Sequence, residues 1–122
     1  MIYRVFVQPT AEEDLLAAYR WAAKAAPISA ARWLGRFRDA LQSLAQAPTR
    51  CPVASESRKV DLELRELHFG KHPNVFRVLF TIHAETVYVL RIRRAQRKPL
   101  TRRELEDSFR VEDEDDLQLP YD

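Results

Sequence analysis

The sequence predicts an α+β domain with the element order β-α-α-β-β-β, in which a helical hairpin covers one face of an antiparallel sheet and a short C-terminal helix follows. Three observations predict this fold. An alternating run opens the chain, two segments with helical spacing follow it, and three strand-like runs fill the second half. The 122 residues, 46% of them hydrophobic, suffice for one core and leave no room for a second domain.

The first strand and the first helix are expected at the N-terminus. Residues 2–8 alternate β-branched and aromatic side chains and stop at Pro9, which is typical of a strand. Thr10 stands directly before a segment with three acids, so we expect its hydroxyl to cap a helix whose positive dipole end those acids stabilise. Apolar residues then recur at helical spacing as far as Pro27, where we expect this helix to end.

The second helix is expected from about Ser29 to near Pro48. Its apolar residues form a near-heptad stripe that comprises Ala30, Leu34, Phe37, Leu41 and Leu44. Only a few residues join the two helices, so they should form an antiparallel hairpin that packs its apolar stripes together and onto the sheet. Residues 48–59 show neither period and contain two prolines, which indicates a connecting loop.

Three more strands are expected at residues 62–69, 75–83 and 87–93. The connections between them are short, as in a hairpin-connected meander. In the middle strand the alternation places Phe76 and its apolar neighbours on one face and Arg77 on the other. We therefore expect the helices to cover the apolar face and the guanidinium groups to gather on an open second face.

The C-terminal part combines a short helix with an acidic tail. Thr101 and Glu104 have the spacing of a capping box, and apolar residues after them can anchor the helix. The last twelve residues hold six acids and no base, so we expect residues 111–122 to form a flexible acidic tail after a single domain at residues 1–110. Because the whole chain has a formal net charge of +2, the rest of it carries +8 and attracts polyanions or acidic protein segments.

The composition excludes several classes of protein. Cys51 is the only cysteine, which excludes an internal disulfide and a multi-cysteine metal site. The N-terminus lacks the basic and apolar regions of a signal peptide, and no apolar run approaches membrane-spanning length. We therefore expect a cytoplasmic protein that needs no metal or cofactor and does not enter a membrane.

Three segments of the second half carry a family signature. They are Leu-Arg-Glu-Leu at residues 64–67, Phe-Arg-Val-Leu-Phe-Thr-Ile at residues 76–82 and Val-Tyr-Val-Leu-Arg-Ile-Arg-Arg-Ala-Gln-Arg at residues 87–97. An aromatic–arginine–aliphatic strand, followed by an aliphatic strand that ends in a basic cluster, resembles the pattern of the RelE/ParE superfamily. This superfamily comprises toxins of type II toxin–antitoxin systems and includes the plasmid stabilisation proteins. The resemblance extends over roughly residues 1–105.

The resemblance implies a growth-inhibiting toxin that a cognate antitoxin holds inactive by wrapping its helices and sheet. RelE-like members are mRNA interferases, which cleave messenger RNA on the ribosome. ParE-like members inhibit DNA gyrase and are not nucleases. Family membership alone does not choose between these two targets.

The resemblance also implies candidate site residues. Arg77 matches the arginine of the aromatic–arginine strand, Arg65 lies where RelE-like members carry a basic residue on the preceding strand, and Arg94 lies near their further basic or histidine residues. We take these three arginines as candidate catalytic residues. The candidate RNA- or target-binding residues are Lys71, Arg93, Arg97 and Lys98. Metal-free RNA cleavage needs such cations, because its transition state carries extra negative charge.

Two departures from the nucleolytic pattern favour the ParE-like branch. Arg94 stands where many relatives have a histidine, and no tyrosine lies between Tyr88 and Tyr121 to match the catalytic tyrosine of RelE-like enzymes. We therefore expect gyrase-directed action. The alternatives are a ribosome-dependent, metal-independent endoribonuclease and a non-toxic nucleic-acid-binding module.

Structural roles compete with functional roles for some of these side chains. Arg77 can instead bridge strands or pair with Glu66, and both roles stay open. A general base for RNA cleavage can come from His68, His72 or His83, although solvent-exposed histidines are common at strand ends and in hairpins.

Overall fold

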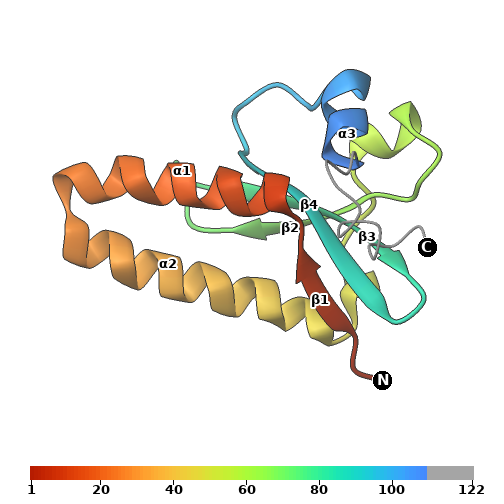
Figure 1. The fold of residues 1–122 in the computed structure, drawn as a ribbon, viewed down its shortest axis with the longest axis horizontal. Helices are drawn as coiled ribbons and strands as arrows, with labels where there is room; N and C mark the ends of the chain where they lie inside the picture. Colours follow the sequence, from red (N-terminus) through yellow and green to blue (C-terminus); the bar gives the residue numbers. More distant parts are fainter. Residues whose placement is uncertain (110–122) are drawn as a thin grey trace.

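The computed structural model describes residues 1–109, which form three α-helices and a four-stranded sheet (Figure 1). The strands are β1 (Arg4–Val7), β2 (Arg65–Phe69), β3 (Phe76–His83) and β4 (Thr86–Arg94), and the α-helices are α1 (Pro9–Ala25), α2 (Pro27–Gln42) and α3 (Arg102–Phe109). The 3₁₀ helices η1 (Ser43–Ala45), η2 (Pro48–Arg50) and η3 (Ser55–Lys59) connect α2 to β2. The order of elements confirms the prediction, although α2 ends before the expected boundary near Pro48. The expected acidic tail at residues 111–122 lies outside the described residues.

Proline begins both long helices. α1 begins at Pro9, and α2 begins at Pro27. Proline suits the first position of a helix because its ring presets φ and its missing N–H would have no intrahelical partner there. α1 ends at Ala25, which agrees with the expected exit at Pro27, whereas the expected start of α2 at about Ser29 is wrong because α2 begins at Pro27. Ala26 alone separates the two helices, which form the predicted hairpin.

Thr10 does not cap α1. It lies in the first turn, and its hydroxyl donates a 2.8 Å hydrogen bond to the carbonyl oxygen of Leu90 on β4. Gln8 takes the N-cap position without a side-chain hydrogen bond, and its backbone N–H donates to the carbonyl oxygen of Val89. Contacts with β4 thus fix the start of α1. These contacts join residues that are distant in the chain, so the local sequence pattern could not predict them.

The sheet has the strand order β1-β4-β3-β2. β2, β3 and β4 form the predicted antiparallel meander, with β2 beginning at Arg65. β1 pairs with β4 in parallel, with Arg4 opposite Thr86 and Val7 opposite Val89, so the sheet is mixed and not purely antiparallel as expected. These two strands are far apart in the chain, and a long connection permits the parallel alignment that a tight hairpin forbids.

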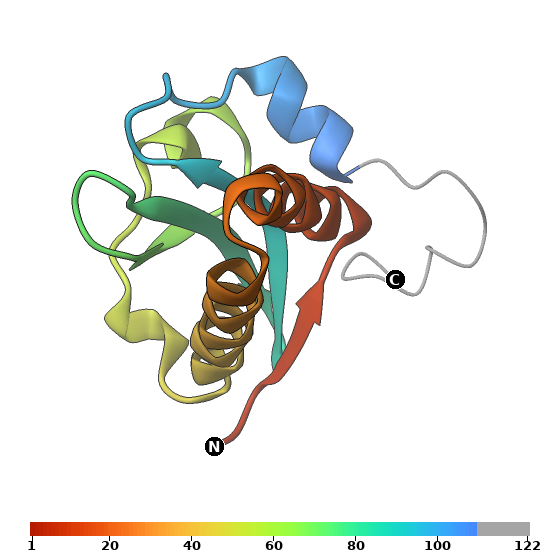
Figure 2. The ribbon, with the colours of Figure 1, turned by 90° about the vertical axis from the view of Figure 1, so that its left-hand side faces the viewer.

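The helical hairpin covers one face of the sheet, as predicted, and Figure 2 shows the two helices nearly end-on in front of it. The core beneath them includes Leu15, Phe37, Leu41, Phe76, Val78, Phe80, Val87 and Val89. The ring centroid of Phe37 lies 4.5 Å from that of Phe69 and 5.8 Å from that of Phe76. Each such buried side chain contributes about 1.5–3 kcal/mol, so this core anchors α2 across β2 and β3.

The second face of the sheet is also covered, contrary to the expectation of an open basic surface. Its core comprises Ala54, Leu64, Leu79, Tyr88, Leu90, Leu100 and Leu105. These residues come from β3 and β4, from the segments around η3, from the segment between β4 and α3, and from α3. Leu79 and Leu90 point away from the helical hairpin. Because it would be unfavourable to leave the apolar side chains of this face in water, other segments cover it. We call this set of residues the second core.

The start of α3 has the predicted capping box. The backbone N–H of Thr101 donates to the carboxylate of Glu104 over 2.9 Å, and the N–H of Glu104 donates to the hydroxyl of Thr101 over 3.1 Å. Leu105 is fully buried, and Phe109 packs against the second core. α3 therefore closes the second face of the sheet.

A β-bulge in β4 decides which of its side chains face the helices. The register between β3 and β4 shifts between Leu79 and Phe80, which leaves Leu90 without a partner on β3. The extra residue reverses the alternation of side chains along the rest of β4. Arg93 therefore lies beside α3 and Arg94 lies towards the helical hairpin, the reverse of what regular alternation predicts.

Candidate functional site

Arg77 points into the second core and is only 8% exposed. Its two terminal nitrogens donate to the carboxylate of Glu56 over 2.7 and 2.9 Å, and its Nε donates to Glu66 over 2.6 Å. Glu56 is fully buried and also accepts the backbone N–H of Leu100 over 3.0 Å. The predicted pairing of Arg77 with Glu66 is confirmed, whereas the expected position of Arg77 on an open face is wrong.

Glu56 and Arg77 stabilise each other's charged form inside the second core. Burial raises the pKa of Glu56, but the hydrogen bonds from Arg77 and from the N–H of Leu100 outweigh it and lower the pKa to about 2. The hydrogen bond to Glu56 is the main reason that the pKa of Arg77 lies above its ordinary value. Both groups are therefore ionised at neutral pH, and an incoming phosphate would have to displace two carboxylates from Arg77.

Arg65 holds β2 against the loop that precedes it. Its Nη1 donates to the carbonyl oxygens of Thr49 and Cys51, and its Nη2 lies 3.1 Å from the carboxylate of Glu63. Burial raises the pKa of the Cys51 thiol, and the nearby charges of Arg50 and Arg65 only partly oppose this. The contacts of Arg65 thus hold parts of the fold together. The raised pKa of the Cys51 thiol does not favour the reactive thiolate.

Asp14 joins α1 to the end of β4. Its carboxylate accepts from Arg91 Nε over 2.7 Å and from the backbone N–H of Ile92 over 2.9 Å. The contact lies just after the bulge, beyond the stretch of β4 that β1 covers. The sequence did not predict this contact. Asp14 is one of three acids near the start of a helix, and nothing in the local sequence indicates that it has a distant partner.

Arg93 lies on the α3 side of the sheet. Its side chain is 9% exposed, and its Nη1 lies 3.2 Å from the carboxylate of Glu104. The pKa of Glu104 is lowered, chiefly by the N–H of Thr101, with burial opposing and Arg93 adding to the shift. The side chain of Arg93, a predicted target-binding residue, is thus largely buried and paired with Glu104 of α3.

Four predicted cations lie near the end of β4, where Arg94 is half-buried and Lys71, Arg97 and Lys98 are exposed. The guanidinium carbon of Arg94 lies 5.4 Å from the centroid of the Phe76 ring, and its Nη1 donates to Asn74 over 3.2 Å. The other members are Lys71, Arg97 and Lys98. Within residues 1–109 the side chains of these three form no ion pair. We call these four cations the basic rim.

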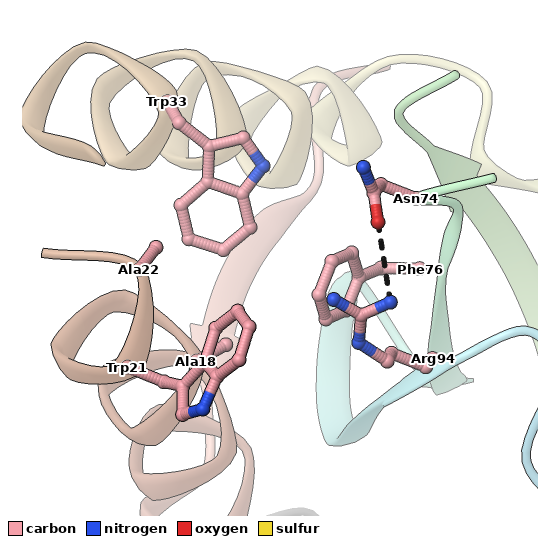
Figure 3. A pocket seen from close by; sticks show the side chains of 7 residues that line it. All are labelled: Ala18, Trp21, Ala22, Trp33, Asn74, Phe76 and Arg94. Carbon is pink, nitrogen blue, oxygen red and sulfur yellow. Dashed lines mark hydrogen bonds between the residues drawn. The ribbon is translucent and has the colours of Figure 1, made fainter. Parts of the chain in front are cut away.

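A groove runs along α1 beside the basic rim. One hollow of about 710 Å³ is lined by Ala18, Trp21, Ala22, Trp33, Asn74, Phe76 and Arg94. A second hollow of about 320 Å³ is lined by Asp14, Ala17, Ala18, Phe76, Arg91, Ile92, Arg93, Arg94, Arg97 and Glu104. The two share Ala18, Phe76 and Arg94, and we call them together the α1 groove. Figure 3 shows the two indoles facing Phe76 and Arg94 across the first hollow.

The α1 groove changes its chemistry along its length. The end of the groove near the junction of α1 and α2 is aromatic, and Trp21 there is 70% exposed. The end beside α3 is lined by four arginines, of which Arg91 and Arg93 are already paired with Asp14 and Glu104. Aromatic side chains and arginine are enriched at protein interfaces. This arrangement suits a partner that carries both apolar and acidic groups.

The candidate general bases are scattered. His68 lies 3.2 Å from Glu66, and His83 ends β3 at the opposite end from Arg94. His72 lies in the β2–β3 loop, which also holds Asn74, the partner of Arg94. Within residues 1–109 no cluster of His, Cys, Asp and Glu suits a metal ion, and no helix there is long and apolar enough to span a membrane.

Comparison with known families agrees with this fold. Residues 5–99 match the family described as the ParE toxin of the type II toxin–antitoxin system parDE. The match defines the class of the protein, which is the toxin component of a type II toxin–antitoxin system. The chain belongs to the ParE toxin family, and the predicted resemblance to the RelE/ParE superfamily is confirmed.

A solved structure has a similar fold. A chain of the structure "Chromosomal ParDE TA system from P. aeruginosa" superimposes with a TM-score of 0.63 and 21% sequence identity. The alignment covers 78% of this chain and 98% of that chain. At this identity the likeness establishes the fold alone. No curated protein matches the chain significantly in sequence.

Proposed function

We propose that this chain arrests growth by inhibiting DNA gyrase, without cutting RNA, and that a cognate antitoxin neutralises it in the cytoplasm. Membership of the ParE family supports the toxin role. The similar solved structure is that of a ParDE toxin–antitoxin system, which supports an antitoxin partner for this chain as well.

The observation that carries the proposal is the burial of Arg77. A ribonuclease needs a cation that meets the scissile phosphate and stabilises its developing charge. Arg77 instead donates to Glu56 and Glu66 in the second core. Releasing it would leave the fully buried carboxylate of Glu56 without its main partner, at a cost of about 3–5 kcal/mol.

The surface that is available fits a protein target better than a reacting phosphate. Trp21 and Trp33 form an apolar wall, and Arg94 and Arg97 add charge beside it. Interfaces between proteins use such aromatic and arginine side chains as anchors. We therefore assign target contact to the α1 groove and the basic rim, and a structural role to Arg65 and Arg77.

The alternative is a ribosome-dependent endoribonuclease. In that case Arg94, Arg97 and Lys71 would stabilise the transition state, and His72 would serve as general base because it shares a loop with Asn74, the partner of Arg94. The ring of His72 has no hydrogen bond within residues 1–109 that would orient it for this task.

Induction of the gene alone tests the proposal in cells. We expect growth arrest that coexpression of an adjacent small open reading frame relieves, together with unchanged messenger RNA 5′ ends. New 5′ ends within ribosomal A-site codons would overturn the proposal in favour of the endoribonuclease. Normal growth at a high level of soluble protein would instead favour a non-toxic nucleic-acid-binding module.

A further inference from the structure

The α1 groove places its two chemistries in a fixed order along α1. Asp14 and Ala17 line the cationic hollow, Ala18 lines both hollows, and Trp21 and Ala22 line the aromatic one. A segment that follows α1 from its N-terminal part therefore meets arginines first and indoles second. Because Arg91 and Arg93 are engaged by acids of the domain, Arg94 and Arg97 remain for an incoming carboxylate.

We propose that the C-terminal segment of this same chain, residues 111–122, docks in the α1 groove. Its sequence has the same order as the groove. The acids come first and are Glu112, Asp113, Glu114, Asp115 and Asp116, and the apolar residues Leu117, Leu119 and Tyr121 follow. The acids pair with Arg94 and Arg97, and the apolar residues pack against Trp21 and Trp33.

The segment starts close enough to reach the groove. Glu104 lines the cationic hollow, and Phe109 ends α3 five residues later, which is about 8 Å further along the helix axis. An extended chain covers roughly 3.3 Å per residue, so seven residues from 110 to 116 span up to about 23 Å. The linker is thus long enough for the acids to reach the cationic hollow, and docking there would direct the residues after them towards Trp21.

Tethering makes this docking effective even if each contact is weak. A short linker gives an attached segment an effective concentration in the millimolar range. The charge balance also favours it, because the last twelve residues carry six acids and no base and the rest of the chain is basic. Any target or antitoxin that uses the α1 groove must then displace the segment, whichever macromolecule that target is.

A competition experiment with the full-length chain tests the proposal. A fluorescent peptide of residues 111–122 is titrated into the natural chain and into a neutralised chain, and its anisotropy is recorded. The neutralised chain carries Glu112→Gln, Asp113→Asn, Glu114→Gln, Asp115→Asn and Asp116→Asn. We expect the peptide to bind the neutralised chain at least about ten-fold more tightly, because its own tail no longer competes. Equal affinity for the two chains would overturn the proposal.

Groove variants in the neutralised chain separate specific docking from general charge attraction. Trp21→Ala and Arg97→Ala alter exposed side chains of the groove, and each should weaken peptide binding about ten-fold. Arg58→Ala removes the same charge as Arg97→Ala from an exposed position on η3 and should change the affinity less than about two-fold. Circular dichroism verifies that each variant is folded.

Two results of this series contradict specific docking. Equal losses from Arg58→Ala and Arg97→Ala would show that only net charge matters. A scrambled peptide of the same composition that binds as tightly as the natural peptide would show that the order of acids and apolar residues is irrelevant. Since the experiment measures binding and not growth arrest, its failure leaves the proposed inhibition of gyrase untouched.

Discussion

Glu56 and Arg77 form a bidentate ion pair inside the second core, with hydrogen bonds of 2.7 and 2.9 Å between carboxylate and guanidinium. The pair joins η3 to β3. The N–H of Leu100 donates to the same carboxylate, and the ammonium of Lys59 donates to the carbonyl oxygen of Leu100 over 2.7 Å. The arginine that the family resemblance marks as functional therefore holds the segment before α3 against the sheet.

Glu56→Gln should lower the free energy of unfolding by roughly 3 kcal/mol, because it removes the charge that balances a buried guanidinium. Urea denaturation measures the change. Glu63→Gln is the matched control, since Glu63 pairs with Arg65 at the surface and should cost at most about 0.5 kcal/mol. Similar small losses in both variants would mean that the buried pair does not stabilise the fold.

The stability of the natural chain should fall in acid. Glu56 has a pKa of about 2 when folded against an ordinary value of 4.5, so the unfolded chain binds the proton more readily. The resulting stabilisation, roughly 3 kcal/mol, is complete above about pH 5 and is lost as the pH falls towards about 2. Urea midpoints measured across this range should drop less steeply for Glu56→Gln, and parallel curves would contradict the assignment.

Arg77→Ala and Arg94→Ala should separate folding from toxicity. Arg77→Ala leaves the buried carboxylate of Glu56 unpaired and should cost about 3–5 kcal/mol of stability. Arg94→Ala removes a more accessible side chain, so it should cost less than about 1 kcal/mol while it weakens target contact. Thermal unfolding and growth assays at matched soluble levels test both. A stable but non-toxic Arg77→Ala protein would show that Arg77 acts in toxicity and not only in folding.

The elements were predictable because their patterns are local. The alternation in residues 2–8, the apolar stripes of the two long helices and the Thr101–Glu104 spacing are each contained within a single element. The four elements that these patterns predict, β1, α1, α2 and α3, all form. The parallel pairing of β1 with β4 was not predictable in this way, since strand order depends on contacts between distant segments. The same holds for Thr10, whose hydroxyl bonds to Leu90 on a strand 80 residues away.

The positions of the candidate site side chains were predicted less well than the fold, for two physical reasons. First, the bulge at Leu90 reverses the alternation, and a single extra residue leaves no mark in the apolar pattern of β4. Second, the burial of Arg77 depends on Glu56, an isolated acid in an irregular segment. One signal did exist, because the uninterrupted apolar run at residues 87–90 is typical of a strand that is buried on both faces.

Asp14→Asn should loosen the junction between α1 and β4. The carboxylate accepts hydrogen bonds from Arg91 and from the N–H of Ile92, so its loss should cost about 1–3 kcal/mol. The expected signature is faster hydrogen exchange at the Ile92 amide. Glu13→Gln is the control, because Glu13 pairs with Arg20 at the exposed surface of the same helix. Unchanged exchange at Ile92 would refute the role of Asp14.

DNA supercoiling by purified gyrase is the most direct test of the central claim. Adding the purified, folded chain should abolish supercoiling of relaxed plasmid, and Arg94→Ala should weaken the inhibition. The same preparation should leave messenger RNA intact on translating ribosomes. Full supercoiling in the presence of a large excess of folded chain would contradict the claim, and cleavage of ribosome-bound message by that preparation would replace it with the nuclease alternative.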